Sequence, residues 1–249
     1  MSNLNTLVKE KNIKALILDM DGVITNTAVV HAEAWKKMTD LFLKKRGEKD
    51  GKSYKPFDVV EDYRSYVDGM PRYDGVRNFL ESRGITIPEG EAADDDGKET
   101  IIGLGNLKNL YFQELLKQNG VVVFEDTLAW VKAYKKNGLK TAVISSSKNC
   151  FDIIRRGGLE QLFEARVDGL VSGELKLKGK PEPDIFLEAA KRLGVKPEET
   201  AIFEDAWAGV AAGKAGNFAL VVGINRGNAG QTLEENGADI VISKFPKPE

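Results

Sequence analysis

A short apolar run that ends in two carboxylates constrains the fold of this chain more than any other stretch. Residues 15–18 are all apolar, and Asp19, Asp21 and Gly22 follow directly. A short and evenly apolar run is typical of a strand buried on both faces, as in parallel sheets. Asp19 and Asp21 are therefore expected at the carboxyl end of that strand, the end at which open α/β sheets bind ligands.

Two acids so close together repel each other unless a cation or a proton compensates their charge. A divalent metal is therefore expected beside Asp19 and Asp21. An ordinary turn remains the alternative for an isolated Asp-x-Asp-Gly, because Asp and Gly are common turn residues. A calcium loop is excluded, because Val23 stands where the next ligand should be and a strand leads into the loop.

Composition limits the class of protein. A chain of 249 residues can bury one core, with or without a small accessory lobe. The formal charge of −2 and the lack of a dense basic stretch argue against binding to nucleic acid or to a membrane surface. Cys150 is the only cysteine, which excludes an internal disulfide and a thiolate zinc cluster. Residues 1–12 lack the apolar core of a signal peptide, so a cytoplasmic protein is expected.

The order of the predicted elements indicates an interrupted α/β domain. Helices are predicted at 28–43, where Gly47 stops the helix, and at 59–67, 76–80 and 101–117, with an acidic, solvated loop at 91–98. Later strands are predicted at 140–144, 165–170, 201–203, 219–222 and 239–242, with helices at 126–136, 148–156, 183–193, 206–215 and 231–236. We therefore expect a Rossmann-like parallel sheet from residues 1–25 and 119–249, interrupted by a helical insertion at 26–118.

Polar groups follow three of these strands. They are Asp19 and Asp21 after the first, Ser145, Ser146 and Ser147 after the strand at 140–144, and Glu204 and Asp205 after the strand at 201–203. Right-handed crossovers keep the carboxyl ends at one edge of the sheet, so these groups can converge. Together with Lys180 they supply acids for a metal, hydroxyls and an ammonium group. Those are the groups needed to hold a phosphoryl group during its transfer.

The order of these motifs resembles the haloacid dehalogenase superfamily, in its branch with a helical cap after the first motif. The motifs are Asp19-x-Asp-Gly-Val, a strand ending in Ser145, Lys180-Pro-x-Pro-Asp, and Glu204-Asp205 followed by Ala-x-x-Gly-Val. The resemblance implies that Asp19 is a nucleophile that becomes an aspartyl phosphate and that Asp21 is the general acid and base.

The same resemblance implies a set of ligands. Mg²⁺ would be held by Asp19, by the main-chain carbonyl of Asp21 and by Asp205, with Glu204 in a supporting place. The phosphoryl oxygens would be bound by Ser145, with Ser146 beside it, and by Lys180.

Within the superfamily the chain is similar to the β-phosphoglucomutases and to related sugar-phosphate phosphatases. The similarity implies that Thr27 and His31 help to position the acid and base, and that Lys108 and Asn109 contact the sugar. It also implies that the second phosphate is bound by Arg72, Ser147, Lys148 and Asn149. Asn26 departs from the usual mutase Asp, and the segments at 48–57 and 89–100 lengthen the cap.

The resemblance implies a phosphohexomutase that interconverts a hexose 1-phosphate and a hexose 6-phosphate through a bisphosphate. A sugar-phosphate phosphatase is the alternative. The two enzymes differ in that a phosphatase needs one phosphate site, whereas a mutase needs two. A non-catalytic phosphosugar-binding protein is a more distant alternative, against which the nucleophile Asp19 argues. Taken alone, His31 is typical of a structural residue, and Arg72 and Lys108 of solvated side chains. The expected protein is a monomer whose partner is a small sugar phosphate.

Overall fold

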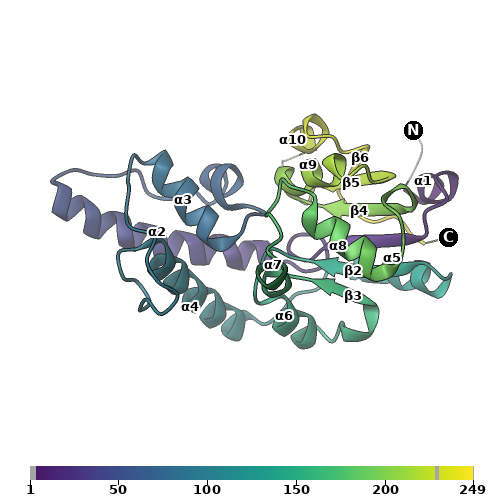
Figure 1. Cartoon of the computed structure of the whole chain (residues 1–249), viewed down its shortest axis with the longest axis horizontal. Helices are drawn as coiled ribbons and strands as arrows, with labels where there is room; N and C mark the ends of the chain where they lie inside the picture. Colours follow the sequence, from purple (N-terminus) through teal and green to yellow (C-terminus); the bar gives the residue numbers. More distant parts are fainter. Residues whose placement is uncertain (1–3, 228–229, 249) are drawn as a thin grey trace. The chain divides into compact units, whose positions relative to one another are not determined.

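The computed structural model describes residues 4–227 and 230–248, and it divides the chain into two compact units (Figure 1). The sheet unit comprises residues 1–26 and 121–249, and the helical unit comprises residues 27–120. The boundaries expected from the sequence, 25/26 and 118/119, differ from these by one and two residues. No helix in the described part of the chain combines the length and apolarity that a membrane span requires.

The sheet unit is built on a parallel sheet, as the sequence predicts. In the described residues its strands are β1 (Ala15–Asp19), β2 (Lys140–Ile144), β3 (Ala165–Val167), β4 (Thr200–Glu204), β5 (Leu220–Ile224) and β6 (Ile240–Ile242), in the order β3-β2-β1-β4-β5-β6. The central strand β1 is buried along its whole length. The strand order reverses between β1 and β4, the position at which such sheets bind ligands.

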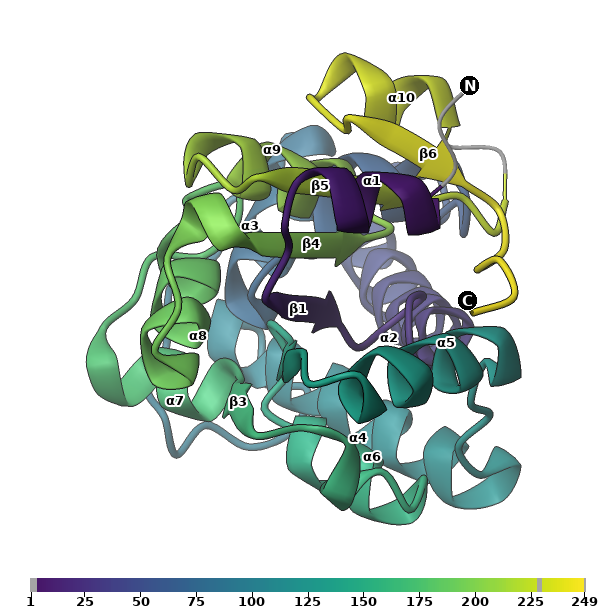
Figure 2. The same ribbon diagram turned by 90° about the vertical axis from the view of Figure 1, so that its right-hand side faces the viewer.

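Helices cover both faces of the sheet. One face packs against α8 (Asp184–Leu193), α9 (Trp207–Ala215) and α10 (Gly230–Glu235) in a shared apolar core. The other face packs against α1 (Leu4–Glu10) and α5 (Glu125–Lys136), whose Trp130 contacts Phe203 of β4. Figure 2 shows α8 and α5 on opposite sides of β1. The predicted α/β architecture is confirmed.

Two elements of the sheet unit differ from the sequence prediction. Helix α1 lies in residues 1–12, where no element was predicted, and its Leu4 and Val8, one turn apart, are both buried. The strand expected at 165–170 ends at Val167, because the Asp168 carboxylate accepts hydrogen bonds from the next amides and starts helix α7 (Gly169–Leu175). The unit also contains α6 (Cys150–Arg156) and short 3₁₀ turns at Glu160–Leu162 and Pro197–Glu199.

The helical unit contains three α-helices and a short π-helix. They are α2 (Thr27–Asp50), η1 (Tyr63–Val67), α3 (Arg72–Ser82) and α4 (Ile101–Asn119). Residues 27–120, all of which are described, contain no strand, so the predicted helical insertion is confirmed. Side chains from α2, α3 and α4 share one apolar core that includes Trp35, Phe79 and Leu104.

Helix α2 is longer than predicted, because Gly47 does not end it. A Cβ at Gly47 would lie 2.5 Å from the Lys52 carbonyl oxygen, so this glycine lets the returning chain pack against the helix. The helix ends at Asp50, and Gly51 then adopts a φ of 64°. Gly51 is therefore the residue that stops the helix, in the left-handed conformation that glycine favours.

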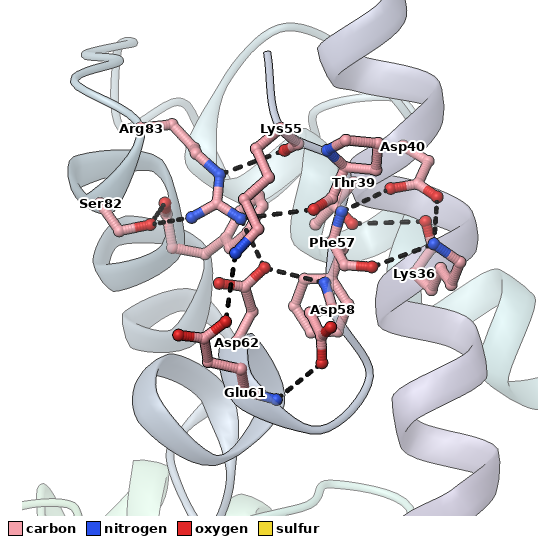
Figure 3. Close-up of polar contacts among 12 residues, drawn as sticks. Lys36, Thr39, Asp40, Lys55, Phe57, Asp58, Glu61, Asp62, Ser82 and Arg83 are labelled. Carbon is pink, nitrogen blue, oxygen red and sulfur yellow. Dashed lines mark hydrogen bonds and ion pairs between the residues drawn. The ribbon is translucent and has the colours of Figure 1, made fainter.

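The segment that follows α2 is attached to that helix through Phe57. The Phe57 amide donates to Asp40 Oδ1 (2.8 Å), and its carbonyl accepts from Lys36 Nζ (3.0 Å) (Figure 3). The Phe57 side chain is buried in the core of the unit. These contacts fix a stretch for which the sequence predicts only additional length.

A buried ion pair holds the other side of the same segment. Arg83 pairs with Asp62, and Arg83 Nε donates to the Lys55 carbonyl (3.2 Å) (Figure 3). Both side chains of the pair are about nine-tenths buried or more. The Asp62 carboxylate also accepts from the Asp58 amide (2.8 Å). This pair therefore links the end of α3 to the chain that leads into η1.

The acidic loop at 91–98 is only partly solvated. Asp94 is buried, and its carboxylate accepts hydrogen bonds from Thr100 Oγ1 (2.7 Å) and Lys98 Nζ (2.5 Å). Thr100 in turn caps α4 by accepting from the Gly103 amide (3.0 Å). The expectation of a freely solvated loop is thus wrong at Asp94, which fixes the loop to the start of α4.

Candidate active site

The turn after β1 folds back onto the Asp19 carboxylate. Asp19 is the last residue of β1, and its Oδ2 accepts a hydrogen bond from the Asp21 amide (2.9 Å). Gly22 has a φ of 84°, a conformation that other residues rarely adopt, and its amide donates to the Thr25 carbonyl (2.7 Å). The local sequence therefore folds back sharply, and Asp19 is left 5% exposed at the end of the strand.

Asp205 reaches this turn from the neighbouring strand. It follows β4 directly, and a Cβ at Gly22 would lie 1.7 Å from Asp205 Oδ2. No side chain larger than glycine fits there, so the turn after Asp19 and the Asp205 carboxylate are in close contact. The strand register explains this contact, because Leu18 of β1 is level with Phe203 of β4.

Lys180 lies between the carboxylates of Asp19 and Glu204 at this edge of the sheet. Its Nζ donates to Asp19 Oδ1 (2.6 Å) and also pairs with Glu204 Oε1, and its side chain is almost completely buried. Burial opposes the charge on this ammonium group, but the Asp19 and Glu204 carboxylates outweigh burial and raise the pKa of Lys180. Lys180 is therefore a fixed, charged group.

Several carboxylates and one ammonium group surround Asp19, and together with burial they determine the direction of its pKa shift. Burial raises the pKa of Asp19 well above its ordinary value, and the nearby charges of Glu204 and Asp21 raise it further. Lys180 lowers the pKa of Asp19, but not enough to cancel these causes. The charged form of Asp19 is thus disfavoured by its surroundings, and an added cation would favour it.

Glu204 has partners that sequence reasoning did not foresee. Its Oε1 pairs with Lys180, and its Oε2 accepts from the Ala206 amide (3.0 Å). A Cβ at Gly209 would lie 2.0 Å from Glu204 Cδ, so this glycine of α9 makes room for the carboxylate. Gly209 is therefore a site residue that we did not predict, although the Ala-x-x-Gly-Val motif contained it.

Ser145 joins the site from β2. Its Oγ donates to Asp21 Oδ2 (3.1 Å) and accepts from the Ser147 amide (3.0 Å). Ser147 Oγ accepts from the Asn149 amide (3.1 Å), so residues 145–149 form a compact turn before α6. A Cβ at Gly169 would lie 2.6 Å from the Ser146 carbonyl oxygen, which shows how tightly α7 packs on this turn.

The expected magnesium ligands suit a hard cation in chemistry and in number. Asp19, Asp205 and the Asp21 carbonyl offer only oxygen atoms, which Mg²⁺ prefers. In the described residues no group of three or more His, Cys, Asp or Glu side chains is arranged as a metal site. The expected set includes two side chains and one main-chain oxygen, so it needs no third side chain. The carboxylates of Glu204 and Asp21, which raise the pKa of Asp19, fit the same ion.

The predicted residues of the helical unit include one buried cluster. His31 of α2 stacks on Phe112 of α4 with their ring centroids 4.0 Å apart, and His31 Nδ1 lies 2.5 Å from Lys108 Nζ. Lys108 is 4% exposed, and its Nζ lies 5.1 Å from the centroids of Trp35 and Phe112. Thr27, the first residue of α2, is also buried. Lys108 is thus not a solvated side chain.

Arg72 is grouped with neutral side chains. Its Nη2 donates to Asn109 Oδ1 (2.8 Å), and its Cζ lies 5.9 Å from the centre of the Tyr73 ring. In the described part of the chain Arg72 has no carboxylate partner. Burial lowers the pKa of its guanidinium group, an effect that Tyr73 opposes. Arg72 is therefore half-buried with its charge uncompensated by an acid.

The helical unit also contains a groove of about 600 Å³. It is lined by the second half of α2 and by the following loop, including Lys44, Lys52 and Tyr54. None of the predicted site residues lines it. We assign it no part in the chemistry.

A family model and several known proteins are similar to this chain over most of its length. The model of the haloacid dehalogenase-like hydrolase family matches residues 13–217. A β-phosphoglucomutase of Mycobacterium tuberculosis is 48% identical over 236 residues, which cover 94% of this chain and 90% of the relative. A phosphorylated carbohydrates phosphatase of Thermotoga maritima is 30% identical, with 95% of each chain covered. A crystal structure of a Clostridium difficile β-phosphoglucomutase matches with a TM-score of 0.72 and 28% identity, covering 94% of this chain and 92% of that one.

Proposed function

We propose a reaction for this chain from one premise: the chain belongs to the haloacid dehalogenase-like hydrolase family. The proposed protein is a magnesium-dependent phosphohexomutase that interconverts a hexose 1-phosphate and a hexose 6-phosphate through a bisphosphate. One observation carries the proposal, the buried contact of 2.6 Å between Lys180 Nζ and Asp19 Oδ1 at the end of β1. The similarity to a β-phosphoglucomutase at 48% identity supports the choice of reaction.

Asp19 is the proposed nucleophile. One of its carboxylate oxygens forms a bond to phosphorus while the bond between phosphorus and the sugar oxygen breaks. Asp21 gives a proton to the departing sugar oxygen and takes it back in the reverse step. The hydrogen bond from Ser145 to Asp21 Oδ2 supports this assignment, because it fixes the orientation of that carboxyl group. Lys180, Ser145 and Ser146 are the proposed ligands of the phosphoryl oxygens.

Asp19, Asp205 and the carbonyl of Asp21 are the proposed magnesium ligands. The ion would neutralise the phosphoryl oxygens and so make attack by a carboxylate feasible. Because both oxygens of Glu204 have other partners, we assign Glu204 the task of holding Lys180.

Arg72 is the proposed ligand of the second phosphate. A half-buried guanidinium group that contacts only neutral side chains in the described residues keeps its charge available to an anion. Ser147, Lys148 and Asn149 are proposed contacts of the same phosphate. Thr27, His31, Lys108 and Asn109 are proposed to position the acid and to contact the sugar. The proposal includes a cytoplasmic monomer that binds neither nucleic acid nor membrane.

A sugar-phosphate phosphatase is the second candidate, and the similarity to a phosphorylated carbohydrates phosphatase favours it. Both candidates share the aspartyl phosphate, so they differ only in the acceptor. A mutase returns the phosphoryl group to a sugar, whereas a phosphatase gives it to water.

Phosphorus NMR of the purified protein with Mg²⁺ and a panel of hexose phosphates tests the proposal. Spectra with and without a hexose bisphosphate primer report interconversion and hydrolysis together. Interconversion that exceeds phosphate release is the expected result. Steady release of inorganic phosphate in excess of interconversion would support the phosphatase instead. Failure to form a hydroxylamine-sensitive phosphoenzyme with any phosphosugar would favour a non-catalytic binding protein.

Asp19→Asn tests the nucleophile directly. We expect this variant to fold normally, because Asn keeps the size of the side chain, and to lose turnover. Asp152→Asn is the control, since Asp152 is exposed on α6 and pairs only with Arg156 among its described contacts. Activity of Asp19→Asn within a few-fold of the wild type would refute the assignment.

A further inference from the structure

Arg72 lies on one face of helix α4. A Cβ at Gly105 would lie 3.4 Å from Arg72 Cδ, and Asn109 Oδ1 accepts from Arg72 Nη2 (2.8 Å). Positions 105 and 109 are one turn apart and share a face of the helix. The aliphatic part of the arginine therefore packs on a glycine, while its charged end meets an amide oxygen.

Tyr73 occupies the space beside Arg72. A Cβ at Gly105 would lie 2.6 Å from two atoms of the Tyr73 ring, so the ring rests directly on the helix backbone. The Tyr73 hydroxyl and Asn106 Oδ1 are 3.1 Å apart and form a hydrogen bond. The ring is thus held both by the backbone of α4 and at its hydroxyl, next to the guanidinium group of Arg72.

Asn106 is itself fixed by the acidic loop. Its Nδ2 donates to the Asp94 carbonyl (3.1 Å), and the Asp94 carboxylate accepts from Thr100, the residue that caps α4. A continuous set of hydrogen bonds therefore runs from the loop at 94–100 through Asn106 to Tyr73. The additional length of this loop has a structural consequence, since it orients the side chain that contacts Tyr73.

We propose that Tyr73 and Asn106 are positioning residues that hold Arg72 in place for the second phosphate of the substrate. The inference rests on the proposed function, in which Arg72 binds that phosphate. An unrestrained arginine side chain samples many rotamers. Binding a ligand restricts it to one of them, which costs conformational entropy. The Tyr73 ring, Gly105 and Asn109 restrict Arg72 without neutralising its charge. The phosphate then meets a guanidinium group that is already oriented.

Two phosphoryl donors separate this role from a purely structural one. A hexose bisphosphate has a second phosphate for Arg72, whereas acetyl phosphate has only the group that is transferred to Asp19, with release of acetate. For Tyr73→Phe we expect the half-saturating concentration of the bisphosphate to rise roughly three- to tenfold, the effect of one lost hydrogen bond. The maximal rate of phosphoenzyme formation and the reaction with acetyl phosphate should stay unchanged.

Tyr111→Phe is the matched control. Tyr111 also belongs to the helical unit and packs against its apolar core, with the Lys37 ammonium group over its ring, but its hydroxyl makes no hydrogen bond in the described residues. Loss of the Tyr111 hydroxyl should leave the reactions with both phosphoryl donors unchanged.

Gly105→Ala provides a second variant that does not weaken the helix. Alanine favours a helix over glycine, so the fold should persist, but the new methyl group displaces the Tyr73 ring. We expect the same selective rise for the bisphosphate. If both variants behaved like the wild type, or lost activity equally with both donors, the positioning role of Tyr73 and Asn106 would be overturned. The proposed function would stand. A wild-type protein that forms no phosphoenzyme from either donor would overturn the proposed function as well.

Discussion

The two units of this protein each contain a positively charged side chain of proposed function, and these two side chains differ in their partners. In the sheet unit Lys180 is buried between two carboxylates, those of Asp19 and Glu204. In the helical unit Arg72 is half-buried against the amide oxygen of Asn109 and the ring of Tyr73. One cation is balanced within the protein, and the other has no acidic partner in the described residues.

This difference separates two uses of a buried positive charge. Lys180 takes part in the fold, because the acids around it would repel each other without it. Arg72 holds no acid in place, so its charge is left for a ligand. The helical unit also contains paired cations, such as Arg83 with Asp62, and these tie loops to helices. Pairing thus distinguishes structural cations from the proposed phosphate ligand within one unit.

Lys180→Met should have the largest effect. The substitution leaves Asp19 and Glu204 buried without their cation, and loss of one partner of a buried pair costs about 3–5 kcal/mol of stability. We also expect no phosphoenzyme to form. Urea unfolding in the presence of a chelator measures the stability. A second variant that combines Lys180→Met with Glu204→Gln should regain part of the stability but none of the activity. Wild-type stability of Lys180→Met would break the comparison.

Arg83→Met should destabilise the protein without changing its chemistry. Asp62 would remain buried and unpaired, at a cost of about 2–4 kcal/mol. The rate of phosphoenzyme formation from acetyl phosphate should match the wild type. Arg156→Met is the control, because Arg156 and Asp152 are both about half exposed and such pairs contribute about 0–1 kcal/mol. A loss of stability no larger than in this control would show that pairing in the helical unit is not structural.

Arg72→Met should show the opposite pattern to Arg83→Met. Because no buried acid is left behind, we expect unfolding free energy within about 0.5 kcal/mol of the wild type. The loss of charged hydrogen bonds to the second phosphate should reduce reaction with a hexose bisphosphate roughly 10- to 100-fold. Reaction with acetyl phosphate should not change. If Arg72→Met destabilised the protein as much as Arg83→Met, Arg72 would be a structural residue.

The elements of the sheet and the position of its site could be predicted from the sequence because both follow from local patterns. A short apolar run identifies β1, and the parallel register then brings the ends of β1, β2 and β4 to the same level. For this reason the sequence alone assigns Asp19, Ser145 and Asp205 to one edge of the sheet. The geometry agrees, although the roles of these residues remain predictions.

The contacts that could not be predicted depend on side chains that are distant in sequence. Two examples are the ion pair of Glu204 with Lys180 and the packing of Tyr73 on Gly105. Neither contact leaves a periodic pattern in the sequence. Gly47 was misread because a glycine in a helix can either end it or admit a neighbouring chain. Helix α1 was missed because only Leu4 and Val8 mark its buried side.

Asp94 gives the smallest expected effect and tests whether the acidic loop acts through charge. Hydrogen bonds from Lys98 and then Thr100 lower the pKa of Asp94 below its ordinary value. A carboxyl group with a lowered pKa stabilises the fold above its unfolded pKa, about 3.9, and this stabilisation is lost as the pH falls through the folded value. The wild type should therefore exceed Asp94→Asn in unfolding free energy at neutral pH, and the difference should disappear in acid. Urea unfolding over a pH series measures it, with Asp96→Asn of the same loop as the exposed control. A difference that persists in acid would show that Asp94 acts through packing, and the loop would then support the Arg72 face of α4 without its charge.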